Sequence, residues 1–204
     1  IDRTGISKTV IHFSASIDAA NRMEETGMAW ELWRLMGVGG VQPNNHAYSS
    51  IITTAAIDRD VRTALKLLEE MKTKDIAIDV VTYTSAICAC GPDWALALDV
   101  LEDMAQDGVP PNLLSFTAAM GACLKGEEYR EAVAVFARMK AAGIAPDLRA
   151  YNLAMMAHEN DGNHYGRIIV EAEMQEANLV SQDRDWETGW QPPPDAAQGG
   201  FDEW

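Results

Sequence analysis

The chain has 204 residues, of which 48% are hydrophobic and 23% charged, and this composition excludes wholesale disorder. No run of about 18 apolar residues occurs, so a membrane-spanning helix is excluded as well. The formal net charge of -15 argues against binding to nucleic acid or an anionic membrane by bulk charge, because both require Lys and Arg.

Two residue types recur at the same intervals along the chain, which is the signature of a repeat architecture. Aromatic residues follow one another at spacings of 35, 35, 33 and 35: Phe13, Tyr48, Tyr83, Phe116 and Tyr151. Methionines follow at spacings of 35, 33, 35 and 35: Met36, Met71, Met104, Met139 and Met174. After a lead-in over residues 1–9, the spacings predict five units: 10–44, 45–79, 80–112, 113–147 and 148–182. The third unit is two residues short, and we place the deletion at Gly91–Pro92, in the turn between its helices.

Each unit has the pattern of two amphipathic helices. In the second unit, the first helix carries apolar residues at i, i+3, i+4 and i+7 from Tyr48, and the second helix repeats that spacing from Ala64. In the third and fourth units Thr82 and Ser115 precede the opening aromatic, and they are the predicted N-caps.

The second helix of each unit ends four residues after its methionine. The residues there suit the left-handed conformation that terminates a helix, with Asp75 the least suitable: Gly40, Asp75, Gly108, Gly143 and Asn178. An aliphatic residue follows, and in three units a proline then prevents the helix from continuing. Because a single hairpin cannot bury its apolar stripe, the units must stack. The predicted fold is therefore all-α, a right-handed solenoid of about five helix-turn-helix repeats.

The segment 183–204 breaks the repeat pattern. It contains six acidic residues against one Arg, together with three Pro and three Gly, so we expect no independent fold. Its aromatic side chains predict a partner-binding arm in which they supply the anchoring contacts: Trp186, Trp190, Phe201 and Trp204.

The units resemble the pentatricopeptide repeat family, whose hairpin of about 35 residues is an α-solenoid unit. The resemblance covers about residues 10–182 and rests on an opening aromatic, Ala in the second helix, Met, Gly, an aliphatic, Pro, and a closing Asp or Asn. The clearest copies read VVTYTSAICAC…ALDVLEDMAQDGVPPN and LLSFTAAMGACLKGEEYREAVAVFARMKAAGIAPD. The alternative is the tetratricopeptide repeat, a peptide-binding hairpin of 34 residues that lacks this regular ending.

The resemblance implies that each unit reads one base of single-stranded RNA, through the residue after the aromatic and the residue that closes the unit. The implied pairs are Ser14 with Asn44, Ser49 with Asp79, Thr84 with Asn112, Thr117 with Asp147, and Asn152 with Gln182. An Asn amide donates and accepts hydrogen bonds, whereas an Asp carboxylate only accepts, so the pairs with Asn imply adenine and those with Asp imply guanine. Units one to four are therefore expected to read adenine, guanine, adenine and guanine, and the fifth pair is assigned no base.

Two further sets of contacts are implied by the resemblance. In units one, three and four an aliphatic side chain before the aromatic would sandwich the base; these residues are Ile11, Val81 and Leu114. His46 and Arg149 stand at this position in units two and five and depart from the pattern. Arg22 and Lys125 occupy positions of phosphate contact, and so few cations predict weak binding at physiological salt. Asn and Asp after Pro are also ordinary turn residues, so a purely structural role fits them too.

Two functions remain open. The first is a non-enzymatic RNA-binding module in an organelle, a mitochondrion or a chloroplast, as the resemblance implies. The second is a scaffold subunit of a large organellar complex, held by protein contacts to the solenoid surface and the arm; a peptide-binding relative or enzyme adaptor is a third possibility. Neither a cofactor nor a small-molecule substrate is predicted. The four His and three Cys form no catalytic triad, and Cys88-x-Cys90 has the wrong spacing for a metal site. Three cysteines also indicate a reducing compartment, and a start at Ile1 without Met suggests a processed or partial product.

Overall fold

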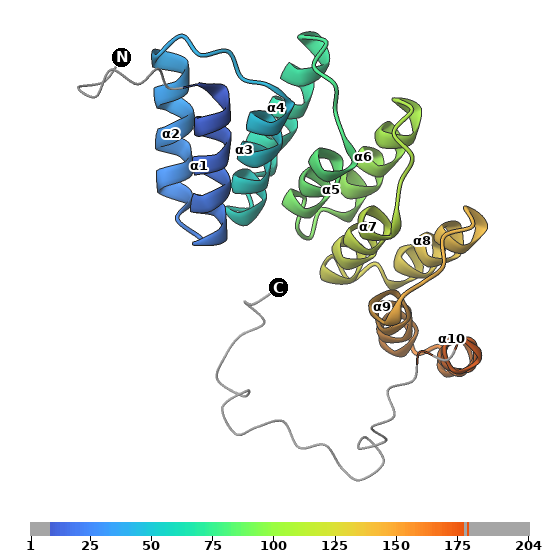
Figure 1. The fold of residues 1–204 in the computed structure, drawn as a ribbon. Coiled ribbons are helices and arrows are strands. Elements are labelled where there is room, and N and C mark those ends of the chain that lie inside the picture. Colours follow the sequence, from blue (N-terminus) through green and yellow to red (C-terminus); the bar gives the residue numbers. More distant parts are fainter. Residues whose placement is uncertain (1–8, 178, 180–204) are drawn as a thin grey trace, which may run out of the picture.

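The computed structural model describes residues 9–177 and 179, and within them it has ten α-helices and no strand. The helices form five hairpins that follow one another in chain order along an arc (Figure 1). They are α1 (Val10–Arg22) with α2 (Thr26–Val38), α3 (Asn45–Ile57) with α4 (Val61–Thr73), α5 (Val80–Ala89) with α6 (Trp94–Gln106), α7 (Leu113–Lys125) with α8 (Tyr129–Ala141), and α9 (Leu148–Asn160) with α10 (His164–Glu176). The all-α fold predicted from the sequence is confirmed, whereas the arm 183–204 lies outside the described residues.

The hairpins stack in two layers. Each first helix contacts the first helix of the next unit, so that α1, α3, α5, α7 and α9 form one continuous layer. Each second helix packs on its own first helix and on the first helix of the next unit. The core is therefore a chain of nearest-neighbour contacts, as expected of a solenoid.

The first helices begin earlier than the sequence prediction placed them. Thr82 and Ser115 are not N-caps; they are the third residues of α5 and α7. The caps are Asp79 and Asn112, whose side chains accept the backbone N–H groups of Thr82 at 2.8 Å and Ser115 at 3.0 Å. Ser115 completes a capping box, because its hydroxyl accepts the N–H of Asn112 at 2.8 Å. The sequence prediction was wrong here because Asp79 and Thr82, like Asn112 and Ser115, are both residue types that suit an N-cap and lie three positions apart.

The second helices end as predicted. The terminating residues of α2, α4, α6 and α8 have positive φ angles between 55° and 75°, and Asp75 adopts this conformation as the three glycines do. The aliphatic residue that follows donates its N–H to the carbonyl of the methionine five positions earlier, which satisfies an otherwise unpaired helix end. These bonds are Val41 to Met36, Ile76 to Met71, Val109 to Met104 and Ile144 to Met139, at 3.0–3.2 Å. Asn178 lies outside the described residues.

The two-residue deletion in the third unit does not shorten the turn between its helices, contrary to the prediction. Helix α5 has 10 residues where the other first helices have 13, and the connection to α6 is four residues long. The deletion therefore removes the last turn of α5. The lengthened connection packs against the next unit at Gly126, where an added Cβ would lie 2.7 Å from both the Pro92 carbonyl oxygen and Cδ1 of Trp94.

The core between units is made by the repeated alanine and methionine of α2, α4, α6 and α8. Ala64, Ala97, Met71 and Met104 are fully buried. At the edges of the array, an aromatic side chain of a second helix meets the opening aromatic of the next unit edge to face. The ring centroids of Trp33 and Tyr48 are 5.1 Å apart, and those of Phe136 and Tyr151 are 5.5 Å apart. In the part of the chain that the structure describes, no helix is both long and apolar enough to cross a membrane.

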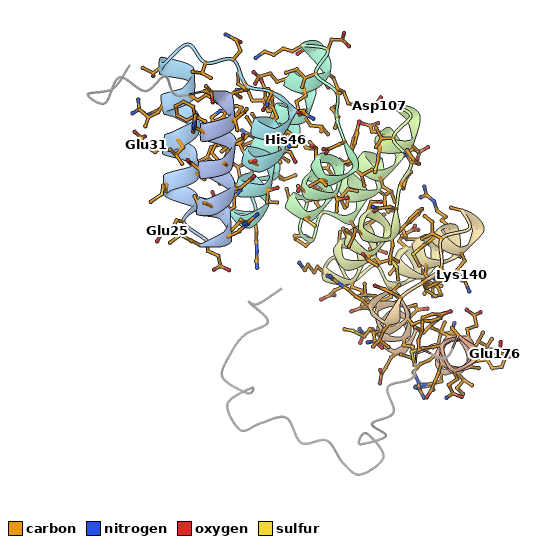
Figure 2. The ribbon with its side chains drawn as sticks, viewed as in Figure 1. Glu25, Glu31, His46, Asp107, Lys140 and Glu176 are labelled. Atoms are coloured by element: carbon orange, nitrogen blue, oxygen red, sulfur yellow. The ribbon has the colours of Figure 1, made fainter. Side chains whose placement is uncertain are left out.

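A partly buried polar contact joins the two helices of the third unit. The Tyr83 hydroxyl, which comes from α5, donates to the carboxylate of Asp107. Asp107 lies at the end of α6 (Figure 2). Lys72 reaches the same carboxylate from the second unit at 2.9 Å. Burial and the neighbouring Asp107 carboxylate raise the pKa of Tyr83 to about 12, so this hydroxyl remains a donor at every physiological pH.

Candidate nucleic-acid interface

The candidate interface is the row of side chains that the first helices present near their N-termini. The second residue of each first helix is exposed, although three of the five are aliphatic. Ile11 is 70% exposed, and Val81 and Leu114 are each 61% exposed. His46 occupies the same position at the start of α3 (Figure 2). Exposed aliphatic side chains repeated at one register leave an apolar surface available to a flat partner such as a base.

The residue after each opening aromatic is a hydroxyl in units one to four. The Ser14 hydroxyl donates to the Val10 carbonyl at 3.0 Å, and the Thr84 hydroxyl donates to the Val80 carbonyl at 2.7 Å. Thr117 forms the same bond to the carbonyl four residues earlier at 2.9 Å. Because the hydroxyl proton is used inside the helix, these oxygens can act only as acceptors. Of the three side chains only Thr84 is partly exposed, since Ser14 is 7% and Thr117 3% exposed. Ser49 is half-buried in α3, and Asn152 is exposed on α9.

The residues that close units one to four are the N-caps of the following first helices. Asn44 accepts the N–H of Ala47 at 3.0 Å through Oδ1, and Asp147 accepts the N–H of Ala150 at 2.8 Å in the same way. The caps at Asp79 and Asn112 have this geometry too. The sequence prediction weighed a turn role against a base-reading role, and the structure shows the turn role directly. Gln182 lies outside the described residues.

Capping uses one oxygen of each closing side chain and leaves the other polar atom for a ligand. In Asn44 and Asn112 the remaining atom is Nδ2, a donor, since Oδ1 must face the backbone N–H. In Asp79 and Asp147 the remaining atom is Oδ2, an acceptor. The cap therefore fixes which atom is available, and the available atom alternates donor, acceptor, donor, acceptor along the array.

The first-helix layer carries little of the negative charge of the chain. Its acidic residues are Asp18 and Glu159, and its basic residues are Arg22, Lys125 and Arg149, which gives a net charge of +1. Arg22 and Lys125 are the last residues of α1 and α7. The remaining negative charge lies on second helices, connections and the arm. Four of the connecting residues cap the first helices and place carboxylates at the ends of this layer: Asp58, Asp79, Asp147 and Asp161.

The cysteine side chains give no sign of a reactive site. Burial raises the pKa of Cys90 to about 12 and that of Cys123 to about 11, so both remain thiols at neutral pH. Among residues 9–177 and 179, the structure brings together no group of three His, Cys, Asp or Glu side chains that could hold a metal ion. The aromatic residues predicted to anchor a partner lie outside the described residues: Trp186, Trp190, Phe201 and Trp204.

The fold and this register define a class of helical-repeat proteins. The family model described as the pentatricopeptide repeat domain matches residues 31–93, 66–127 and 99–160, which together span well over half of the chain. The chain therefore belongs to the pentatricopeptide repeat family.

Relatives and solved structures agree with this assignment. The mitochondrial 15S rRNA processing factor CCM1 of Yarrowia lipolytica is 36% identical over 111 residues, which is 50% of this chain and 14% of that protein. The structure of the pentatricopeptide repeat protein PPR10 in complex with an 18-nt psaJ RNA element matches 87% of this chain and 30% of PPR10, with a TM-score of 0.69 and 22% identity. The PPR domain of Arabidopsis thaliana protein-only RNase P 1, in complex with tRNA, matches 85% of this chain and 93% of that domain, with a TM-score of 0.72 and 14% identity. The chain thus spans about one seventh of the curated relative and under a third of PPR10.

Proposed function

We propose that this protein is a sequence-selective, non-enzymatic module that binds single-stranded RNA. The observation that carries the proposal is the cap geometry, which leaves a donor at Asn44 and Asn112 and an acceptor at Asp79 and Asp147. Two residues after each of these caps, the first helix presents an exposed side chain. At this position it is aliphatic in α1, α5 and α7, where the residues are Ile11, Val81 and Leu114. A ligand that fits has a flat apolar face and an edge of donors and acceptors, which is the description of an unpaired base.

The base preference follows from the polarity of the two atoms in each unit. Thr84 offers an acceptor and Asn112 a donor, which match the amino group and the N1 acceptor of adenine. Thr117 and Asp147 offer two acceptors, which match the N1–H and amino donors of guanine and no pair of groups on the other bases. Cytosine presents the same donor and acceptor as adenine, so the choice of adenine rests on the family resemblance. The preference for units one to four is adenine, guanine, adenine, guanine.

The relatives support this proposal. PPR10 and the PPR domain of protein-only RNase P 1 are each solved with bound RNA, and the Yarrowia lipolytica relative is an rRNA processing factor. That relative is mitochondrial, which favours a mitochondrion as the compartment of this protein. The match to protein-only RNase P 1 covers its repeat domain, so it supports binding and carries no argument for cleavage.

The proposal is tested by measuring binding of the full chain to short RNA oligonucleotides at physiological salt. An oligonucleotide that contains adenine-guanine-adenine-guanine is expected to bind several-fold more tightly than a scrambled one of equal composition. Equal affinity for the two would remove the base-reading role, and no binding to either would remove the function itself.

A second candidate function, a scaffold subunit held by protein contacts, is favoured by the surface of α10. Tyr165 of α10 is equivalent in the repeat to Arg62 of α4, and Ile169 is equivalent to Lys66. Two outer positions that are basic in α4 are therefore apolar in α10. Tyr165 is 75% exposed, Ile169 is 42% exposed, and the adjacent Ile168 is 56% exposed. These three apolar side chains lie on one face of the helix, which is the pattern of a partner-binding surface.

The face of α10 that would receive a sixth hairpin is instead ionic. Glu171 of α10 occupies the position of Phe136 in α8, whose ring packs on Tyr151. The Arg167 guanidinium forms an ion pair with Glu171 at 3.1 Å. A partner at α10 would therefore bind to the outer apolar face and not continue the stack. A Tyr165→Glu, Ile169→Glu double variant that keeps RNA binding and still co-purifies with every native partner would argue against the scaffold function.

A further inference from the structure

The outer face of α10 carries an apolar row that the other second helices lack. The row consists of Tyr165, Ile168, Ile169 and Ala172, which are spaced i, i+3, i+4 and i+7 and are all exposed. The positions of Tyr165 and Ile169 hold only small or charged residues in the other four second helices: Gly27 and Glu31, Arg62 and Lys66, Ala95 and Asp99, Arg130 and Ala134. The row is therefore specific to the last hairpin and lies outside the packing that repeats along the array.

The chain reverses direction directly after α10. The N–H of Leu179 donates to the carbonyl of Met174 at 3.2 Å, and the Leu179 side chain packs on the core. The same bond ends α2, α4, α6 and α8, and there the chain turns back into the next first helix (Figure 1). Trp186 of the arm follows seven residues after Leu179. Seven extended residues span up to about 24 Å, and Tyr165 lies about 16 Å back along α10 from its last residue, so the arm can reach the whole apolar row.

The charge beside the apolar row is opposite to that of the arm. Arg130 of α8 pairs with Asp161 directly before α10 at 3.3 Å, and Lys140 of α8 pairs with Glu173 of α10 at 2.6 Å. These contacts place α8 beside α10, and α8 carries three basic residues against one acidic residue. The acidic residues of α10 all follow Ile169, so the first half of the helix has none. The arm carries six acidic residues against one Arg, and an arm that lies over α10 and α8 therefore meets net positive charge.

We propose that the apolar row of α10 is the docking site of the protein's own C-terminal arm, with Trp186 and Trp190 seated on it. The row is about 10 Å long, and the four residues between the two tryptophans span about 6 Å as a helix or about 14 Å when extended, so both rings can contact it. Large aromatic side chains on an exposed apolar surface supply the anchoring contacts of such an interface. A segment tethered this closely has an effective concentration on the order of mM, so it occupies the row ahead of a free partner of equal affinity. A scaffold partner at this face would have to displace the arm.

The test is the rate at which trypsin cleaves the full chain after Arg184, the basic residue of the arm. Cleavage follows the fraction of molecules in which the arm is released, so a docked arm is cleaved slowly. The Tyr165→Glu, Ile169→Glu variant places carboxylates beneath the tryptophan rings, and cleavage after Arg184 is expected to be at least about 10-fold faster. The matched control is Ala95→Glu, Gln106→Glu, which adds the same two charges at exposed positions of α6 and is expected to keep the wild-type rate.

Two further measurements separate docking from damage to α10. Cleavage after Arg167, inside α10, reports on the helix itself and is expected to stay slow in every variant. Trp190→Ser removes an anchor from the arm, six residues past the cleaved bond, and is expected to accelerate cleavage after Arg184 as well. Combining Trp190→Ser with the α10 variant is expected to add little, because both substitutions break the same contact.

Three results would overturn the inference. The first is an equal rate after Arg184 in wild type and the α10 variant. The second is a fully additive effect of Trp190→Ser and the α10 variant, which would show that the two act independently. The third is protection of Arg184 that disappears on dilution, which would show that the row holds the arm of a second copy. If Arg167 and Arg184 are cleaved faster together, the α10 variant has unfolded the helix, and the rate of Trp190→Ser against wild type then decides. Docking of the arm does not depend on RNA binding, so each of these results leaves the proposed function standing.

Discussion

Asn112→Asp is the substitution that separates base reading from helix capping. Both side chains cap a helix equally well, and Oδ1 of either can accept the N–H of Ser115 that Asn112 accepts at 3.0 Å. The free atom changes from the Nδ2 donor to an Oδ2 acceptor. The substitution thus inverts the polarity that faces the third base and leaves the start of α7 in place.

The expected effect is a reversal of preference at the third base. An acceptor placed against N1 of adenine loses a hydrogen bond and repels a lone pair, whereas the same acceptor gains a bond from guanine. Discrimination by such polar contacts is about 1–3 kcal/mol, which corresponds to a change in the affinity ratio of roughly 5- to 150-fold. Because Asn and Asp are comparable caps, the free energy of unfolding is expected to change by less than about 0.5 kcal/mol.

The assay is fluorescence anisotropy with RNA oligonucleotides that carry adenine-guanine-adenine-guanine or adenine-guanine-guanine-guanine, each also in the reversed direction. Asn163→Asp is the matched control, because Asn163 caps α10 by accepting the N–H of Gly166 at 2.9 Å and lies in the outer layer. The control adds the same charge and is expected to keep the wild-type ratio between the two sequences. A ratio that moves equally in both variants, or in neither, would refute base reading by Asn112.

Three further predictions follow from the same structure. Asp79→Asn, the reverse exchange, is expected to move the second base from guanine to adenine in the same anisotropy assay with thermal stability unchanged. Gly126→Ala is expected to lower the free energy of unfolding in urea by about 1–3 kcal/mol, because its Cβ would lie 2.7 Å from atoms of the third unit. Gly121→Ala, whose Cβ would meet nothing within 4 Å, is expected to raise it by up to about 1 kcal/mol. Equal effects of the two substitutions would contradict the packing at Gly126. The hydrogen bond from Tyr83 and the charge of Lys72 lower the pKa of Asp107, so its contribution to stability is present above about pH 4 and is lost as pH falls through the lowered value. Unfolding measured between about pH 2 and 6 is expected to show a shallower acid loss in Asp107→Asn than in wild type, and parallel curves would count against that contact.

The sequence was sufficient for the fold because the aromatic and methionine ladders mark the same two points in every hairpin. The helix ends were predictable for the same reason, since a residue of positive φ follows the methionine of α2, α4, α6 and α8 at a constant interval. The helix starts were not, because Asp79 and Thr82 are both good caps three residues apart, and only the backbone shows that α5 begins at the earlier one.

The candidate site was predictable as a set of residues and not as a geometry. The pairs that close each unit were found from their positions, but the orientation that caps impose on Asn112 and Asp147 depends on which backbone N–H they meet. Arg149 was noticed only as a departure from the aliphatic register.

The most direct measurement is selection of bound RNA from a random library by the full chain at physiological salt, followed by sequencing. We expect enrichment of adenine-guanine-adenine-guanine over four adjacent positions, and a shift of the third position to guanine in the library selected by Asn112→Asp. Enrichment of unrelated sequences, or an identical motif for wild type and variant, would contradict the claim that the caps of the first helices determine which base each unit reads.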